Sequence, residues 1–216
     1  MLTFTVLGPL RVLRDGEPVS PGAKKQRTVL ALLIARSNRA VSLDDLIDEV
    51  WPDDPPESAV ANVRTYAANL RREFAAVGAP DTIVRSGDGY QLTLGPAACD
   101  ALVFEDLRQR AGAARAGGDL AGCARLLEEA GRLWRGSALG GVAAGPRLKA
   151  WAAALDAAQL AAVEELAEVR VDLGAAATAL PALRELVTAH PLRERAQALL
   201  MRALHQQGDV AAALQV

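Results

Sequence analysis

The pattern of apolar and polar positions divides this 216-residue chain into two halves. Up to residue 95 the pattern changes every few residues, as expected where short strands and short helices alternate. The stretch "LTFTVLGPLRVL" predicts two strands that separate at Gly8-Pro9, and the Asp-Gly pair at residues 15–16 predicts a tight hairpin turn. From Asp100 onward only helical periods remain. The segment "GPAACD" near residues 95–100 is the predicted boundary between two domains, 1–95 and 100–216.

Three helices are predicted in the first half. "PGAKKQRTVLALLIARSN" has the period of a helix that faces a core with Leu30, Leu33 and Ile34. "LDDLIDEV" follows a capping-box pattern that begins at Ser42, and Trp51-Pro52 ends it, with Trp51 expected in the core. The third helix contains "NVRTYAANLRREF", and "TIVRSGDGYQLTL" then predicts a second hairpin. Strands, helix, helix, loop, helix and hairpin occur in this order in a winged helix with an N-terminal sheet.

The third helix has two contrasting faces when its residues are placed at about 100° per residue. Val63, Ala67, Leu70 and Phe74 form one narrow apolar stripe. The opposite arc contains no carboxylate and consists of Asn62, Arg64, Thr65, Ala68, Asn69 and Arg72. Duplex DNA repels carboxylates, and the major groove is wide enough for one helix, so this face suits DNA. A solvated outer face is the alternative interpretation.

The distribution of acids supports the DNA interpretation, although the formal net charge of −2 does not. Seven acids cluster before the third helix, and none occurs from Ser58 to Arg72. The acids in this cluster are Asp44, Asp45, Asp48, Glu49, Asp53, Asp54 and Glu57. Those of "LDDLIDEV" are expected to form a solvated face, because adjacent carboxylates on a short helix are a weak metal-site signal.

The second half carries a faint repeat. "GAAATAL" begins at Gly174 and "GDVAAAL" at Gly208, which is the 34-residue spacing of a tetratricopeptide unit. A generic helical bundle is the alternative. Because solenoids need terminal capping, the pattern at Val216 also indicates a piece of a longer chain.

Several kinds of site are not expected. Cys99 and Cys123 lack a zinc-site spacing, His190 and His205 stand alone, and "GGVAAGPR" lacks the Lys-Ser/Thr of a phosphate loop. The sequence therefore predicts no metal, no cofactor and no enzymatic activity. It also shows no signal peptide or membrane span, which favours a cytoplasmic protein without membrane contact.

The motifs "FTVLGPLRV", "KKQRTVLALLI", "LIDEVWPDDPPESAVANVRTYAANLRR" and "GYQL" closely resemble the Streptomyces antibiotic regulatory protein family. The resemblance implies an OmpR-type winged-helix domain followed by an all-α, tetratricopeptide-like bacterial transcriptional activation domain. It also implies activation of secondary-metabolite gene clusters, binding to direct repeats in promoter DNA, a second protomer on that DNA and recruitment of RNA polymerase. A helical-repeat interaction scaffold, whose winged helix contacts protein, is the rival interpretation.

Two sets of contact residues follow. The DNA-binding set combines the third helix, the start of the first core helix, where phosphate is favoured, and the wing. Its members are Lys24, Lys25, Gln26, Arg27, Asn62, Arg64, Thr65, Asn69, Arg71, Arg72, Arg85 and Ser86. The resemblance to OmpR-type activators implies polymerase contact by the loop before the third helix, through Pro52, Asp53, Asp54 and Glu57.

Overall fold

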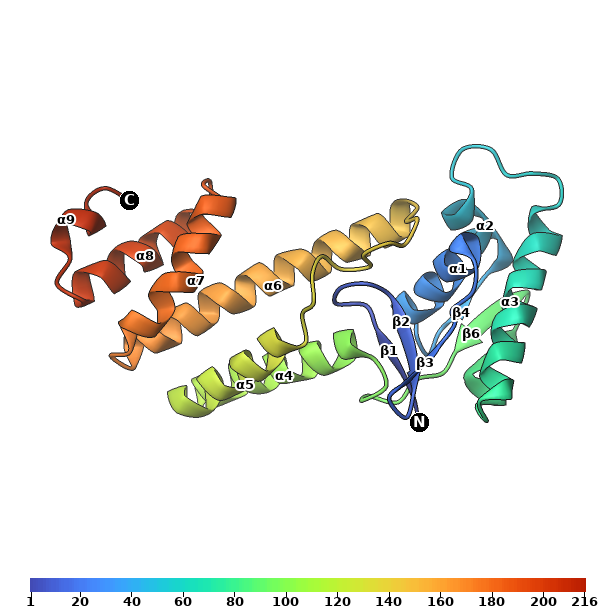
Figure 1. The fold of residues 1–216 in the computed structure, drawn as a ribbon, viewed down its shortest axis with the longest axis horizontal. Helices are drawn as coiled ribbons and strands as arrows, with labels where there is room; N and C mark the ends of the chain where they lie inside the picture. Colours follow the sequence, from blue (N-terminus) through green and yellow to red (C-terminus); the bar gives the residue numbers. More distant parts are fainter. The chain divides into compact units, whose positions relative to one another are not determined.

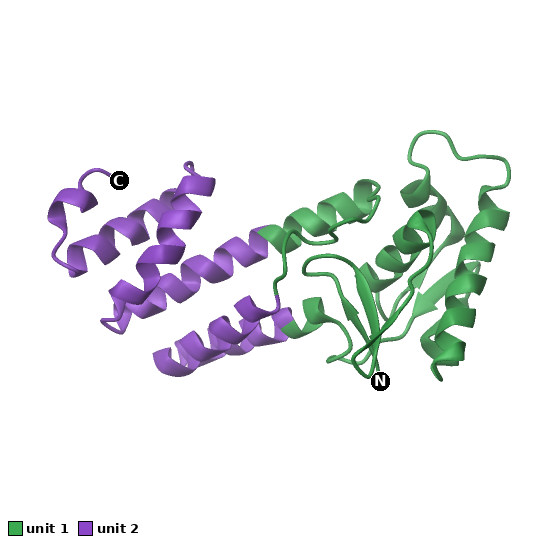
Figure 2. Cartoon of the chain, viewed as in Figure 1, with its two compact units in different colours: residues 1–103, 134–156 green, residues 104–133, 157–216 purple.

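The computed structural model describes residues 1–216 and divides them into two compact units. Unit 1 contains residues 1–103 and 134–156, and unit 2 contains residues 104–133 and 157–216 (Figure 2). The division between these units differs from the predicted boundary at residues 95–100, because unit 1 also includes the later segment 134–156. The assignment of residues 1–95 to DNA binding and residues 100–216 to activation stays a prediction.

Unit 1 begins with an antiparallel sheet of three strands in the order β1-β2-β3. They are β1 (Leu2–Thr5), β2 (Arg11–Arg14) and β3 (Glu17–Val19). Asp15 and Gly16 both have positive φ angles, 51° and 93°, as a type I′ hairpin requires. The predicted strands and hairpin turn are therefore confirmed.

The winged helix follows in the predicted order (Figure 1). Its helices are α1 (Lys24–Ala35), α2 (Leu43–Val50) and α3 (Ala59–Ala76), and a short 3₁₀ helix, η1 (Pro80–Thr82), follows α3. Its sheet has the order β4-β6-β5, with β4 at Ala40–Val41, β5 at Ile83–Ser86 and β6 at Gly89–Leu92. Ser42 caps α2 as predicted, because its hydroxyl accepts the Asp45 amide at 3.1 Å.

A buried carboxylate attaches the later segment of unit 1 to its N-terminal sheet. Asp100, which is 8% exposed, accepts the amides of Val6 at 2.8 Å and Leu7 at 3.2 Å. It also pairs with the Arg135 guanidinium. Burial raises the pKa of Asp100, while these amides and Arg135 act in the opposite direction. The Arg135 amide in turn donates to the Leu7 carbonyl at 2.8 Å, so residues near 135 complete this part of unit 1.

Unit 2 is entirely helical, as the sequence predicts. The helices of the second half are α4 (Asp100–Ala116), α5 (Leu120–Arg132), α6 (Pro146–Asp172), α7 (Ala176–Ala189), α8 (Glu194–Gln206) and α9 (Val210–Ala213). Gly174 and Gly208, at φ 75° and 81°, precede α7 and α9, so both copies of the faint repeat begin with the same turn. The tetratricopeptide assignment itself stays a prediction.

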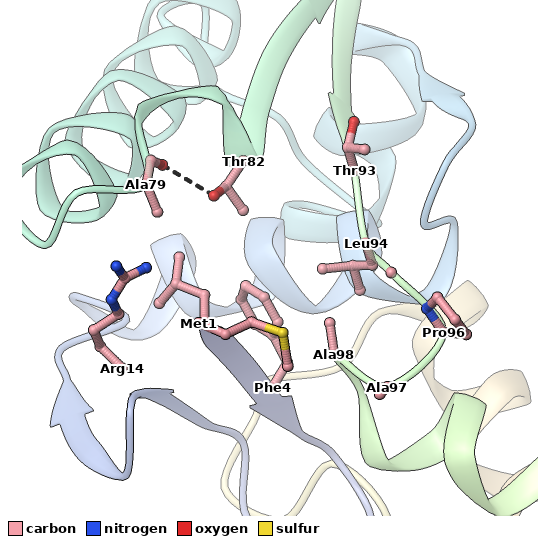
Figure 3. A pocket seen from close by; sticks show the side chains of 12 residues that line it. Met1, Phe4, Arg14, Ala79, Thr82, Thr93, Leu94, Pro96, Ala97 and Ala98 are labelled. Carbon is pink, nitrogen blue, oxygen red and sulfur yellow. Dashed lines mark hydrogen bonds between the residues drawn. The ribbon is translucent and has the colours of Figure 1, made fainter.

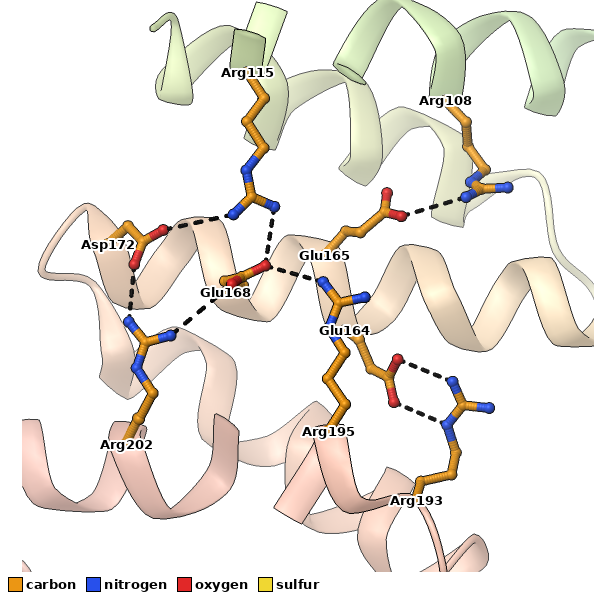
Figure 4. Close-up of polar contacts among 9 residues, drawn as sticks. All are labelled: Arg108, Arg115, Glu164, Glu165, Glu168, Asp172, Arg193, Arg195 and Arg202. Carbon is orange, nitrogen blue, oxygen red and sulfur yellow. Dashed lines mark hydrogen bonds and ion pairs between the residues drawn. The ribbon is translucent and has the colours of Figure 1, made fainter. Parts of the chain in front are cut away.

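Carboxylates of α6 join the neighbouring helices of unit 2 through arginines (Figure 4). Glu164, only 2% exposed, accepts two hydrogen bonds from Arg193, at 2.8 and 2.9 Å. Glu168 lies between Arg115 of α4 at 2.9 Å and Arg195 of α8 at 3.0 Å. Glu165 and Asp172 pair in the same way with Arg108 and Arg202, respectively.

Candidate nucleic-acid interface

The apolar stripe of α3 is fully buried, as predicted. Val63, Ala67, Leu70 and Phe74 are each 0% exposed, and the Phe74 ring meets Phe4 edge to face with centroids 5.9 Å apart. Four fully buried side chains at helical spacing fix how α3 is rotated about its axis. The opposite face is therefore the one that unit 1 presents outward.

That outward face carries exposed arginines. Arg64, Arg71 and Arg72 are exposed, and so are Thr65 and Ala68. Asn62 and Asn69 are half-buried. The arginines of unit 1 that form ion pairs are Arg14, Arg135 and Arg147, so none of them belongs to α3 or the wing. Their guanidinium groups thus remain available for phosphate oxygens or a guanine edge.

Two polar side chains of this face bond along the helix itself. The Asn62 amide donates to the Ser58 hydroxyl at 3.1 Å, and the Thr65 hydroxyl donates to the Ala61 carbonyl at 2.9 Å. These bonds stabilise the first turns of α3. They leave the Asn62 carbonyl oxygen and the lone pairs of Thr65 available as acceptors.

A stack of three side chains connects α1, the loop after α2 and α3. The Trp51 and Tyr66 rings are 6.3 Å apart at an interplanar angle of 25°, and the Lys25 ammonium lies 4.3 Å from the centre of the Trp51 ring. The prediction that Trp51 belongs to the core was wrong, because it is half-buried. A cation is attracted to the face of an indole, so Trp51 holds Lys25 near α3.

The residues at the start of α1 that are predicted to contact phosphate differ in their exposure. Lys24 and Lys25 are exposed, and the first turn contains no acid. Gln26, however, is only 6% exposed, and Arg27 donates to the Leu10 carbonyl at 3.3 Å. The helical phase turns the Gln26 side chain inward, and one guanidinium nitrogen of Arg27 bonds within the fold. Phosphate contact by Arg27 stays a prediction. Gln26 can offer DNA its backbone amide only.

The wing is the hairpin of β5 and β6. Arg85 pairs with Tyr90 and Ser86 with Gly89 across the ladder, which leaves Gly87 and Asp88 at the tip. Gly87 has a φ angle of 59°. A side chain on Gly89 would collide with the Val41 carbonyl, so β6 approaches β4 closely because residue 89 is glycine. Arg85 is exposed and Ser86 is half-buried.

The loop from Pro52 to Glu57 lies entirely on the surface. Pro52, Asp53, Asp54 and Glu57 are exposed, and neither aspartate forms an ion pair or a hydrogen bond. This loop is thus accessible to a protein partner.

The acidic face of α2 is not simply solvated, and this expectation was wrong for Glu49. Glu49 is 2% exposed and accepts the amides of Arg147 at 3.0 Å and Leu148 at 3.1 Å, in the first turn of α6. Arg147 also donates to Asp45 at 2.6 Å. A carboxylate at a helix N-terminus binds free amides and is favoured by the helix dipole. Glu49 therefore anchors the first turn of α6 to α2.

Unit 1 also has an apolar cleft of about 340 Å³ beyond the end of α3 (Figure 3). Phe4, Leu94 and Ala98 line it, and the Arg14 side chain lies at its edge. Elsewhere, no cluster of three or more potential ligands could hold a metal. None of the helices has the length and hydropathy needed to cross a membrane.

The fold and the acid-free face define a winged-helix module of the kind that binds nucleic acid. Comparison with protein families agrees: residues 16–92 match "Transcriptional regulatory protein, C terminal", and residues 99–216 match "Bacterial transcriptional activator domain". The chain belongs to the Streptomyces antibiotic regulatory protein family. This family consists of transcriptional regulators rather than enzymes.

Individual relatives of known name are also regulatory proteins. The chain is 40% identical over 216 residues to the regulatory protein AfsR of Streptomyces coelicolor, covering 100% of this chain and 21% of that protein. It is 34% identical over 221 residues to the regulatory protein DnrI of Streptomyces peucetius, covering 99% of this chain and 81% of that protein. It thus spans about a fifth of AfsR and most of DnrI.

A solved structure has the same fold. The structure of Mycobacterium tuberculosis EmbR in complex with a low affinity phosphopeptide superposes with a TM-score of 0.95 at 32% sequence identity. The match covers 99% of this chain and 57% of that chain. The predicted fold class, a winged-helix domain followed by an all-α domain, is confirmed.

Proposed function

We propose that this chain binds promoter DNA sequence-specifically and activates a secondary-metabolite gene cluster, with α3 in the major groove. The observation that carries the proposal is the exposed, unpaired arginine set on a helix whose other face is fully buried. Arg64 and Arg72 would contact phosphates or guanine edges, and Asn69 an adenine edge. Arg85 and Ser86 on the wing and Lys24 and Lys25 on α1 would contact the neighbouring backbone.

We further propose that the target contains direct repeats and that two protomers bind side by side. Membership of the family supports this, and so does the charge of unit 2. Most of its arginines already pair with carboxylates, as do the five that contact α6, which makes this unit a poor DNA ligand. Its helices would contact the neighbouring protomer or RNA polymerase, in the cytoplasm, where transcription takes place.

The test of DNA binding is a titration of the whole chain on duplexes with one and two repeats. On the one-repeat duplex, Arg64→Ala and Asn69→Ala should lose affinity, and the matched Arg184→Ala should not, because Arg184 is exposed on α7 of unit 2. Equal affinities for the unmodified chain and all three variants would contradict the placement of α3 in the major groove. Equal affinity per site on both duplexes would contradict side-by-side binding and favour the scaffold interpretation.

Polymerase contact by the loop is a separate proposal. The acids of the loop are exposed and unpaired, and acidic side chains are unsuited to DNA. Asp53→Ala combined with Asp54→Ala should reduce transcription in a reconstituted assay while DNA affinity stays unchanged. The control removes the same charge elsewhere in unit 1, with Glu17→Ala and Asp81→Ala, both exposed. If DNA affinity and transcription fall together, the loop has a folding role instead.

A further inference from the structure

A second cationic site lies in unit 1, away from α3. It is a cavity of about 200 Å³ whose polar lining consists of Arg36, Arg39, Arg147 and Asp45. The remaining lining is apolar and comes from α1 and β4. Three arginines thus line one small cavity together with a single aspartate.

The turn that carries two of these arginines is rigid. Asn38, at a φ angle of 65°, stands between them. Its side chain donates to the Leu94 carbonyl at 3.0 Å and accepts the Leu94 amide at 2.9 Å, and its own amide donates to the Leu92 carbonyl at 2.8 Å. The Arg36 and Arg39 backbones are therefore held in place against the end of β6. Only the side chains of Arg36 and Arg39, and not their backbone, must then be ordered when a ligand binds.

The positive charge of the cavity is only partly compensated. Arg147 contacts Asp45 at 2.6 Å and Asp48 at 3.6 Å, whereas Arg36 and Arg39 form no ion pair. The two unpaired arginines follow the C-terminus of α1, where the helix dipole favours cations. The dipole does not explain Arg147, because that residue belongs to α6 and joins them from a distant part of the sequence.

We propose that this cavity binds a phosphate-bearing small molecule, whose phosphoryl oxygens accept hydrogen bonds from Arg36, Arg39 and Arg147. Guanidinium forks match phosphate geometry, and a phosphoryl dianion balances the two uncompensated charges. The cavity has room for a phosphoryl group and a small organic part. Arg147 stands in the first turn of α6 and already pairs with Asp45 and Asp48. An occupant gives Arg147 a third anionic partner, next to the amides that Glu49 caps. It thereby stabilises the attachment of α6 to α2.

DNA phosphate is the other source of this chemistry, and the topology disfavours it. Arg39 directly precedes β4, whose Ala40 pairs with Gln91 of β6. The tip of the wing is at residues 87–88, so Arg39 lies near the base of the hairpin, roughly 10 Å or more from the tip along the strand.

The experiment uses the full chain and two probes, inorganic phosphate and pyrophosphate, at an ionic strength kept constant with chloride. Calorimetric titration should show saturable binding, and the melting temperature should rise by about 2 °C or more at saturation. Arg36→Gln and Arg39→Gln should each weaken binding about tenfold, as expected for the loss of one charge-assisted hydrogen bond. Arg184→Gln is the matched control and should bind like the unmodified protein.

Each outcome decides between the alternatives. Circular dichroism first establishes that both variants fold, which is expected because Arg36 and Arg39 are exposed. Absence of saturable binding, or an equal loss in Arg184→Gln, would overturn the proposal. If Arg36→Gln and Arg39→Gln instead lose DNA affinity as strongly as Arg64→Ala, the occupant is DNA backbone and not a small molecule. Unchanged DNA affinity together with lost pyrophosphate binding supports the proposed site.

Discussion

The arginines of α3 and the wing, which form the proposed recognition surface, and the arginines of unit 2 have opposite surroundings. Arg64, Arg71, Arg72 and Arg85 are exposed and form no ion pair. In unit 2 the arginines that contact α6 each meet a carboxylate, and Glu164 and Glu168 form ion pairs with four of them between them. The same side chain is therefore left unpaired in one region and neutralised within the fold in the other. The two regions differ in how many carboxylates lie near their arginines, a difference that the net charge of the chain does not show.

The largest expected effect on folding comes from the buried pair in unit 2. Arg193→Ala leaves the Glu164 carboxylate, 2% exposed, without its partner, and removing one member of a buried pair costs about 3 kcal/mol. Urea denaturation should show this loss in the free energy of unfolding. Arg184→Ala, on the exposed face of α7, should change it by less than about 0.5 kcal/mol. Similar values for both variants would show that the pairing in unit 2 is not structural.

The recognition arginines should behave in the opposite way. Arg64→Ala or Arg72→Ala should weaken operator binding, making its free energy less favourable by about 1–3 kcal/mol. The free energy of unfolding should change by less than about 0.5 kcal/mol, because no contact within the fold is lost. Fluorescence anisotropy on duplexes and urea denaturation measure the two quantities. A folding defect without a binding defect would reverse the assigned roles of the two regions.

The salt dependence of binding should resolve a smaller effect at the start of α1. Lys24→Ala should reduce the slope of log K against log salt by about 1, because one phosphate contact releases its counterions. Lys149→Ala removes another exposed lysine of unit 1, on α6, and should leave the slope unchanged. Equal slopes for the two variants would place Lys24 outside the interface.

The smallest expected effect is a dependence of stability on pH in unit 2. The hydrogen bond from Arg115, joined by that from Arg195, lowers the pKa of Glu168 from its ordinary 4.5. A lowered carboxyl pKa contributes stability that is present above pH 4.5 and is lost as pH falls through the lowered value. Arg115→Ala should reduce the loss of unfolding free energy on acidification, measured by urea denaturation at a series of pH values from about 6 to 3. Arg110→Ala, whose partner Asp106 is exposed, is the control and should not alter it.

Much of the winged helix was predictable because its signals are local. The stripe from Val63 to Phe74 follows from helical periodicity, and the Asp15-Gly16 turn follows from the backbone angles that these residues tolerate. The phase within α1 was harder to predict. Lys24 and Lys25 are exposed, yet the next residue, Gln26, is buried. Where a stretch is polar throughout, periodicity does not show which side faces the core.

By itself, the sequence determined the order of elements, the buried stripe of α3 and the segregation of acids from the recognition face, because each depends on residues close together in the chain. Only the tertiary structure decided the roles of Glu49 and Asp100. Glu49 bonds an amide 98 residues away and Asp100 one 94 residues away. A buried carboxylate is stable only when donors converge on it, and that convergence depends on how distant segments pack. No local pattern distinguishes such a carboxylate from its solvated neighbours.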